Sequence, residues 1–145
     1  FRSVVLLRTG VVLARGGGAL PRLALPFRLF LGGPLGSGRQ YFPWIHLEDV
    51  VRIVLFALDT PDLSGPVNVV APNPPPQAEF ARELGRALGR PALLPVPSIA
   101  LQLLLGEAAG LLLSSQRVIP KALRARSFSF RFERPREALA DLLGR

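Results

Sequence analysis

The feature that most constrains the fold is a nearly continuous hydrophobic run close to the start of the sequence. Residues 4–7 and 11–13 are β-branched residues and leucines, separated only by Arg8, Thr9 and Gly10. Hydrophobicity without alternation is typical of a parallel strand that is covered on both faces. The run therefore predicts one buried strand that continues past the glycine, with Arg8 buried in a structural ion pair.

Two segments further along the chain have the periodicity of helices. Residues 48–60 place apolar side chains at helical spacing behind Glu48 and Asp49, whose negative charges favour the positive end of a helix dipole. Residues 77–88 have one apolar face, and Gly89 is placed to end that helix in the left-handed conformation. We expect Asp49 to act as a helix-terminal acid rather than as a catalyst.

The remaining segments complete an α/β pattern. Short strands are expected at residues 67–70, 93–94 and 128–132, an extended segment at 41–45, and helices at 98–113, where Ser98 would be the N-cap, and at 137–143. Pro21 and Pro26 limit residues 19–31 to short helical pieces. Strands that alternate with helices indicate an α/β fold with a partial, largely parallel sheet.

Neither glycine-rich segment has the context of a dinucleotide-binding motif. Such a motif needs a strand, a tight glycine turn and then a helix N-terminus that faces the pyrophosphate. Residues 33–38 are followed by Arg39, Gln40, Tyr41, Phe42 and Pro43, which do not start a helix. Residues 16–18 are followed closely by Pro21, so the cofactor fingerprint is missing from this chain and the residues that bind a cofactor are unknown.

Composition excludes several classes of site and leaves one binding hypothesis open. The chain has no cysteine and one histidine, which excludes disulfides, thiol nucleophiles and multi-histidine metal sites, so no metal is expected. The formal net charge is +8, and all but one of the 18 basic residues are arginine. A basic cluster near the C-terminus could bind nucleic acid, but a solvated surface is the preferred interpretation because no groove-reading motif accompanies it. The cluster comprises Lys121, Arg124, Arg126, Arg131, Arg134 and Arg136.

The sequence indicates a cytoplasmic protein without a membrane span. Residues 98–113 form the longest apolar stretch, which is shorter than the roughly 20 residues needed to cross a bilayer and contains Glu107. The absence of cysteine suits the cytosol.

A mixed polar and aromatic segment beside the glycine-rich loop is the candidate substrate pocket. Its candidate residues are Phe27, Arg39, Gln40, Trp44 and His46, because such groups on irregular structure suit a small-molecule site. Core packing explains Trp44 equally well. For His46 the preferred alternative is a strand-end histidine that is hydrogen-bonded to the start of the next helix.

Five motifs in order resemble the C-terminal half of the extended or atypical short-chain dehydrogenase/reductases, in the branch of epimerase family proteins and NADP-dependent oxidoreductases. They are Leu-Arg-Thr-Gly-Val-Val-Leu at 7–13, the glycine-rich loop at 32–38, Trp-Ile-His-Leu-Glu-Asp at 44–49, Gly-Pro-Val-Asn at 65–68 and Ala-Pro-Asn-Pro at 71–74. The resemblance implies that residues 1–90 are the C-terminal half of a Rossmann-like, NADP- or NAD-binding region. Residues 91–145 resemble the helical C-terminal extension of unassigned function found in that branch.

In the family, a Tyr-x-x-x-Lys pair in the N-terminal half performs the proton transfer that accompanies hydride exchange. This chain has only Tyr41 and Lys121, 80 positions apart, so it holds no catalytic residue of that kind. Family members are much longer, so we expect the chain to be the substrate-binding portion of a longer oxidoreductase or epimerase. Phe42 and Pro43 stand where nucleotide-sugar enzymes have an Arg-Asp pair, which disfavours a nucleotide sugar and leaves the small-molecule substrate unidentified.

Two alternatives stay open beside this reading. One is a basic, non-enzymatic binding module for nucleic acid or a protein. The other is an interaction domain whose apolar helix at residues 98–113 docks a partner. The enzyme interpretation is preferred, with no nucleic acid and no membrane as partners. The sequence leaves the oligomeric state undetermined.

Overall fold

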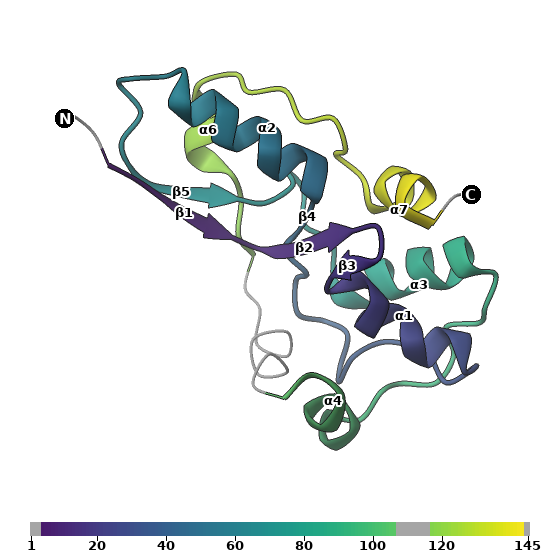
Figure 1. Ribbon diagram of the computed structural model, residues 1–145. Coiled ribbons are helices and arrows are strands. Elements are labelled where there is room, and N and C mark those ends of the chain that lie inside the picture. The colour runs from purple at the N-terminus through teal and green to yellow at the C-terminus, as the bar shows by residue number, and fades with distance from the viewer. Residues whose placement is uncertain (1–3, 107–116, 144–145) are drawn as a thin grey trace.

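In the computed structural model, which describes residues 4–106 and 117–143, the hydrophobic run near the start forms two strands rather than one. β1 (Val5–Thr9) pairs in parallel with β5 (Gly65–Val69). β2 (Val11–Ala14) pairs in parallel with β4 (Trp44–His46) and antiparallel with the short β3 (Gly17–Gly18). Figure 1 shows β1 leading directly into β2, so one continuous segment of the chain contributes a strand to each of the two sheets.

Gly10 lies where the chain passes from one sheet to the other. A Cβ atom at this position would lie 2.7 Å from Cγ1 of Val70 and 2.8 Å from the carbonyl oxygen of Pro43. Any other residue would therefore push these segments apart. The glycine divides the predicted strand because β5 and β4 approach the backbone closely on either side of it.

The prediction that β1 and Arg8 are buried is wrong for this structure. Leu6 is 57% exposed and Leu7 is 39% exposed, and Arg8 is also exposed, with no ion pair among the residues that the structure describes. The physical reason is that β1 is paired along one edge only. Its sequence is that of an interior strand, but its position is that of an edge strand.

One hydrophobic cluster joins β5 to the helices on one face of the β1–β5 pair. α2 (Leu47–Leu58) and the short α6 (Lys121–Ala125) both contribute to it (Figure 1). Its buried members are Ile45, Ile53, Leu63, Val67, Val69 and Leu123. The predicted strand at 67–70 and helix at 48–60 are therefore confirmed, each with a shift of one to two residues at its ends.

A second cluster is built around three helices. α3 (Gln77–Leu88) packs between α1 (Leu20–Arg28) and α7 (Pro135–Leu143), and Phe42 stacks on Phe80 with ring centroids 4.3 Å apart. α1 is longer than expected, because Pro21 occupies its first turn, where no helical N–H bond is needed. Pro26 is tolerated near its end, and the helix stops two residues later.

The other predicted elements are confirmed in part. α3 and its left-handed end at Gly89 (φ 67°) match the prediction. α4 (Ser98–Leu105) covers the first half of the helix expected at 98–113; Pro97 rather than Ser98 is its N-cap, and residues 107–113 lie outside the described residues. Residues 93–94 and 128–132 form no strand. Of the described helices, none has both the length and the apolar character required to cross a membrane.

Candidate functional site

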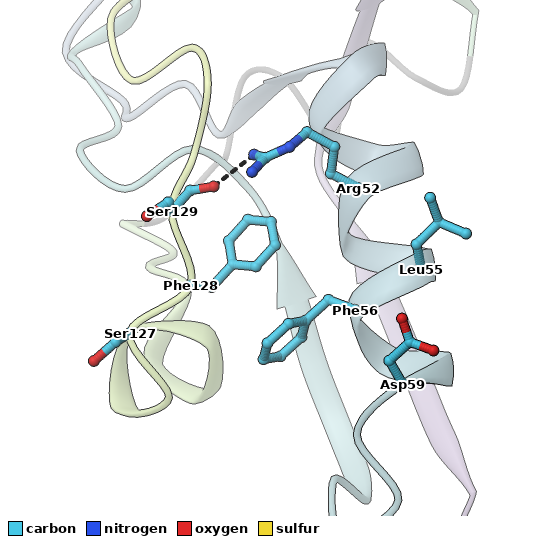
Figure 2. A pocket seen from close by; sticks show the side chains of 7 residues that line it. All are labelled: Arg52, Leu55, Phe56, Asp59, Ser127, Phe128 and Ser129. Atoms are coloured by element: carbon cyan, nitrogen blue, oxygen red, sulfur yellow. Dashed lines mark hydrogen bonds between the residues drawn. The ribbon is translucent and has the colours of Figure 1, made fainter.

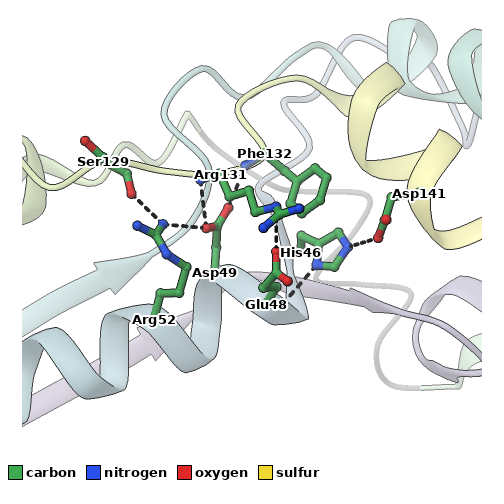
Figure 3. Close-up of polar contacts among 8 residues, drawn as sticks. All are labelled: His46, Glu48, Asp49, Arg52, Ser129, Arg131, Phe132 and Asp141. Atoms are coloured by element: carbon green, nitrogen blue, oxygen red, sulfur yellow. Dashed lines mark hydrogen bonds and ion pairs between the residues drawn. The ribbon is translucent and has the colours of Figure 1, made fainter.

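His46 lies at the end of β4, where both of its ring nitrogens have partners (Figure 3). Nδ1 accepts a hydrogen bond from the backbone N–H of Glu48 at 2.9 Å, and Nε2 lies 2.9 Å from Oδ2 of Asp141 on α7. Since Nδ1 is an acceptor, the neutral ring carries its proton on Nε2 and donates it to Asp141. The ring also stacks on Phe132, with centroids 4.1 Å apart.

These contacts confirm the expected hydrogen bond between His46 and the start of the next helix, in which the N–H of Glu48 is the donor. A contact between His46 and a substrate stays a prediction, and it would have to displace one of the two polar partners. Asp141 was not found from the sequence, because 95 positions separate it from His46 and no local pattern marks it.

Asp49 is fully buried in the first turn of α2 and binds the C-terminal segment (Figure 3). Its carboxylate oxygens accept the backbone N–H groups of Arg131 at 2.9 Å and Phe132 at 3.0 Å. Arg52 donates to the same carboxylate at 3.1 Å and also to the carbonyl oxygen of Ser129. Asp49 is therefore a structural acid, as expected, but it holds a distant segment in addition to favouring the helix start.

The glycine-rich loop is held rigidly against the start of α3. The backbone N–H of Leu35 donates to Oε1 of Gln77 at 2.7 Å, and Gln77 is itself buried. Nε2 of Gln40 donates to the carbonyl oxygen of Leu35 at 3.0 Å, while the N–H of Gln77 donates to the carbonyl oxygen of Gln40 at 2.7 Å. This closed set of bonds fixes the backbone that carries Arg39.

Arg39 and Gln40 thus lie on one ordered loop, but their environments differ. Arg39 is exposed and forms no ion pair among residues 4–106 and 117–143, so its guanidinium is free to bind an anionic or polar group. Gln40 is half-buried, and its amide is used within the loop.

Phe27 and Trp44 lie in the core rather than on an open surface. Phe27 is 4% exposed and Trp44 is fully buried, and both belong to the cluster around α1 and α3. Nε1 of Trp44 has no hydrogen-bond partner in the described part of the chain. The structure therefore places both residues in one hydrophobic cluster, and their contact with a substrate stays a prediction.

A shallow groove of about 380 Å³ lies between α2 and the segment before Arg131 (Figure 2). Phe56 and Phe128 meet edge to face at 5.2 Å within it, and the guanidinium of Arg52 lies 5.2 Å from the Phe128 ring centroid. Arg52 is already bonded to Asp49 and Ser129. The groove is apolar and offers no acid–base pair that could act on a substrate.

Three of the six residues of the basic cluster pair with carboxylates of the described residues, and a fourth bonds to a carbonyl oxygen. Arg126 pairs with Asp62 at 3.0 Å, and Arg131 pairs with Glu48 at 2.9 Å. Arg124 donates to the carbonyl oxygen of Pro72, and Arg136 pairs with Glu83. Within the described ranges no group of acidic, histidine or cysteine side chains could hold a metal ion.

Comparison with known proteins shows which family this chain resembles. Residues 96–142 match the family described as Domain of unknown function (DUF1731). The chain is 49% identical over 140 residues to Epimerase family protein SDR39U1 of Mus musculus, a match that covers 96% of this chain and 48% of the relative. The human protein of that name is 46% identical with the same coverage. The chain matches the C-terminal half of the epimerase family proteins.

Solved structures of the epimerase family agree with the fold. The chain superimposes on human epimerase family protein SDR39U1, crystallised with NADPH, with a TM-score of 0.89 and 45% identity, covering 98% of this chain and 48% of that one. A nucleoside-diphosphate sugar epimerase from Corynebacterium glutamicum gives a TM-score of 0.74 at 36% identity, covering 98% of this chain and 26% of that one. The predicted fold, the C-terminal part of an NAD(P)-binding short-chain dehydrogenase/reductase fold, is confirmed. The chain spans about half the length of the curated relatives it matches.

Proposed function

We propose that this chain forms the substrate-binding portion of an NADP- or NAD-dependent oxidoreductase or epimerase of the epimerase family. The observation that carries the proposal is the TM-score of 0.89 to a human relative crystallised with NADPH. The missing Tyr-x-x-x-Lys pair and cofactor glycines assign the hydride and proton chemistry to the other half of such an enzyme.

In this proposal the ordered loop carries the groups that contact the substrate. Arg39 offers a free guanidinium on a backbone that Gln77 holds in place, so it can position a polar or anionic substrate without reorganising. Gln40 supports the same loop. Phe27, Trp44 and His46 stay predicted pocket residues, although all three are buried in this structure, and the orphaned Nε1 of Trp44 is a donor that a buried water could satisfy.

The proposed division of the chain follows the same reasoning. Residues 1–90 would complete the Rossmann-like region, and residues 91–145 would form the C-terminal extension. The interactions of His46 and Asp49 with Asp141 and Phe132 would then fix that extension to the Rossmann-like region. A cytoplasmic location stays a prediction, and the small-molecule substrate stays unidentified.

NADPH fluorescence titration tests the proposal. The protein to use is a fusion in which the N-terminal half of the human relative precedes this chain, with the chain alone as the control. We expect saturable enhancement of NADPH fluorescence by the fusion and none by the chain alone. No binding by a folded fusion at millimolar NADPH would refute the proposal.

A further inference from the structure

The groove between α2 and the C-terminal segment has two different walls. On α2 and its C-cap, Arg52, Phe56 and Asp59 are spaced by four and three positions, so they lie along one face of the helix. The facing wall is the irregular segment 127–129 that follows α6 (Figure 2). The volume of about 380 Å³ is at the lower end of the range of small-molecule sites. The groove therefore has room for one small molecule.

The middle of the groove is aromatic. Phe56 and Phe128 meet edge to face, and both are only half-buried, so part of each ring stays open to solvent. Aromatic rings attract apolar groups and also cations that approach their faces. The guanidinium of Arg52 lies 5.2 Å from the Phe128 centroid, so a cation already lies against this ring. An apolar molecule with a positive charge suits such rings.

The two ends of the groove differ in free charge. At one end, Nη1 of Arg52 binds the buried carboxylate of Asp49 at 3.1 Å, so the charge of this guanidinium is balanced within the chain. Arg126, next to Ser127 in the chain, is likewise bound to Asp62 at 3.0 Å. At the other end, Asp59 is exposed and forms no ion pair within residues 4–106 and 117–143. The unbalanced charge in the described groove is therefore negative.

The end of α2 adds to this negative character. The last turn of a helix leaves carbonyl groups without intrahelical partners, and the helix dipole places partial negative charge there. α2 has no basic residue in its last turn, and Asp59 is its C-cap. An acid at this end of a helix is unfavourable. A cation bound beside Asp59 would relieve that repulsion.

We propose that the groove binds a small organic cation, in which an ammonium group is joined to a short aromatic or aliphatic body. The ammonium group lies against Asp59 and the end of α2, and the body lies on Phe56 and Phe128. Arg52 and Asp59 are about 10 Å apart along the helix axis, because each residue adds 1.5 Å. This length fits a molecule the size of phenethylamine, with its charge directed away from the guanidinium.

The net charge of the chain does not prevent binding of a cation at this site. The formal net charge is +8, but charges farther away than the Debye length of about 8 Å are largely screened at physiological salt. The local balance at Asp59 then decides the preference. The inference uses neither the cofactor nor the loop that carries Arg39, so it does not depend on the proposed function.

A titration followed by NMR of the backbone amides tests the proposal, first in the chain and then in the fusion protein. The probes are phenethylamine, phenethyl alcohol and phenylacetate, which share a ring but are cationic, neutral and anionic at pH 7. We expect shifts at Phe56, Asp59, Ser127 and Phe128. The amine should bind about threefold more tightly than the alcohol, as expected for an exposed ion pair, and the acid more weakly than the alcohol.

Three outcomes of this titration would overturn the proposal. Equal affinities for the three probes, or shifts confined to other parts of the chain, would show that the groove does not select a cation. Tighter binding of phenylacetate would make Arg52 the anchor and an anion the ligand. Binding to the chain that disappears in the fusion would show that the groove is closed in the longer protein.

A matched pair of variants assigns the charge preference to one side chain. Asp59→Asn removes the charge and keeps the shape, and it should fold like the wild type because Asp59 is exposed. In this variant we expect the amine to bind no more tightly than the alcohol, with the affinity of the alcohol unchanged. Glu79→Gln is the control, because Glu79 is also an exposed acid but lies on α3, outside the groove. A preference for the amine that survives Asp59→Asn, or that Glu79→Gln abolishes equally, would refute the site.

Discussion

Nε2 of His46 lies 2.9 Å from Oδ2 of Asp141, and this bond joins the end of β4 to the last helix across 95 positions of sequence. Asp141 is 47% exposed in its side chain, so the bond is partly screened by water. Asp141→Asn keeps an acceptor oxygen, whereas Asp141→Ala removes it. We expect the alanine variant to lower the free energy of unfolding by about 1 kcal/mol and the asparagine variant to lower it by less. Urea unfolding measures both, with Asp59→Asn as an exposed acidic control.

Nitrogen-15 NMR of the single histidine tests the same relationship independently. The hydrogen bonds predict a neutral ring protonated at Nε2, because Nδ1 accepts from the N–H of Glu48. A ring protonated at Nδ1 at neutral pH would contradict the arrangement. The Asp141→Ala variant should keep the Nδ1 signal of an acceptor, since that bond does not involve Asp141.

Asp49→Ala should be among the most destabilising single changes in the chain. The substitution leaves the buried N–H of Phe132 and the N–H of Arg131 without their acceptors and removes the carboxylate partner of Arg52. Leaving a buried donor unpaired costs about 1–3 kcal/mol, and the N–H of Arg131 is only partly buried, so we expect a loss of about 2–4 kcal/mol in chemical denaturation.

Glu79→Ala is the matched control, because Glu79 is also an acid in the first turn of a helix but is exposed. The control should cost no more than about 0.5 kcal/mol, as expected for a helix-dipole interaction. Similar losses for the two variants would show that Asp49 acts only through the helix dipole.

Gln77→Ala should loosen the glycine-rich loop. The change removes the acceptor for the buried N–H of Leu35, at a cost of about 1–2 kcal/mol. In the fusion protein we expect exchange at the Leu35 amide to accelerate, and Arg39 to lose its fixed position. Ser37→Ala is the control for losing a loop side chain that does not bond to Leu35, because the Ser37 hydroxyl accepts the N–H of Arg39 at 3.2 Å and lies 3.4 Å from Oε1 of Gln40. Unchanged exchange at Leu35 would show that the loop is ordered by other contacts.

The Arg126–Asp62 pair should add a small, pH-dependent stabilisation. The hydrogen bond from Arg126 lowers the pKa of Asp62 below its ordinary value of 3.8, so the pair stabilises the folded state above that pH. The contribution is lost as the pH falls through the lower pKa of the folded state. Asp62→Asn should therefore unfold slightly more easily than the wild type at pH 7, and the difference should vanish in acid. A difference that persists at the lowest pH would show that the effect is not electrostatic.

The local elements were predictable because their signals are local. The apolar spacing of residues 77–88 with Gly89 after them defines α3, and the β-branched residues around Val67 define β5. The exposure of β1 was not predictable from the sequence. Its apolar residues are typical of a strand that is buried on both faces, but the described residues leave Leu6 and Leu7 exposed. The alternating Phe128, Phe130 and Phe132 suggested a strand, but their backbone is instead held by the Asp49 carboxylate.

The candidate site was predictable only in outline. His46 and Asp49 could be chosen from the sequence, because His46 is the one histidine of the chain and Asp49 is an acid at the start of the helix that follows it. Their partners at Arg131, Phe132 and Asp141 lie more than 80 positions away and follow from tertiary packing alone. Trp44 could be assigned equally to the core or to a pocket by sequence, and its complete burial together with an unpaired Nε1 is a property of the folded chain.

A crystal structure of the fusion protein with saturating NADPH tests the central claim most directly. We predict that β1 will be an interior strand of a larger parallel sheet, and that the cofactor will lie in a cleft between the two halves, with its glycine contacts outside this chain. NADPH enclosed by residues 4–143 alone, or β1 still at an open edge in the complete fold, would contradict the account.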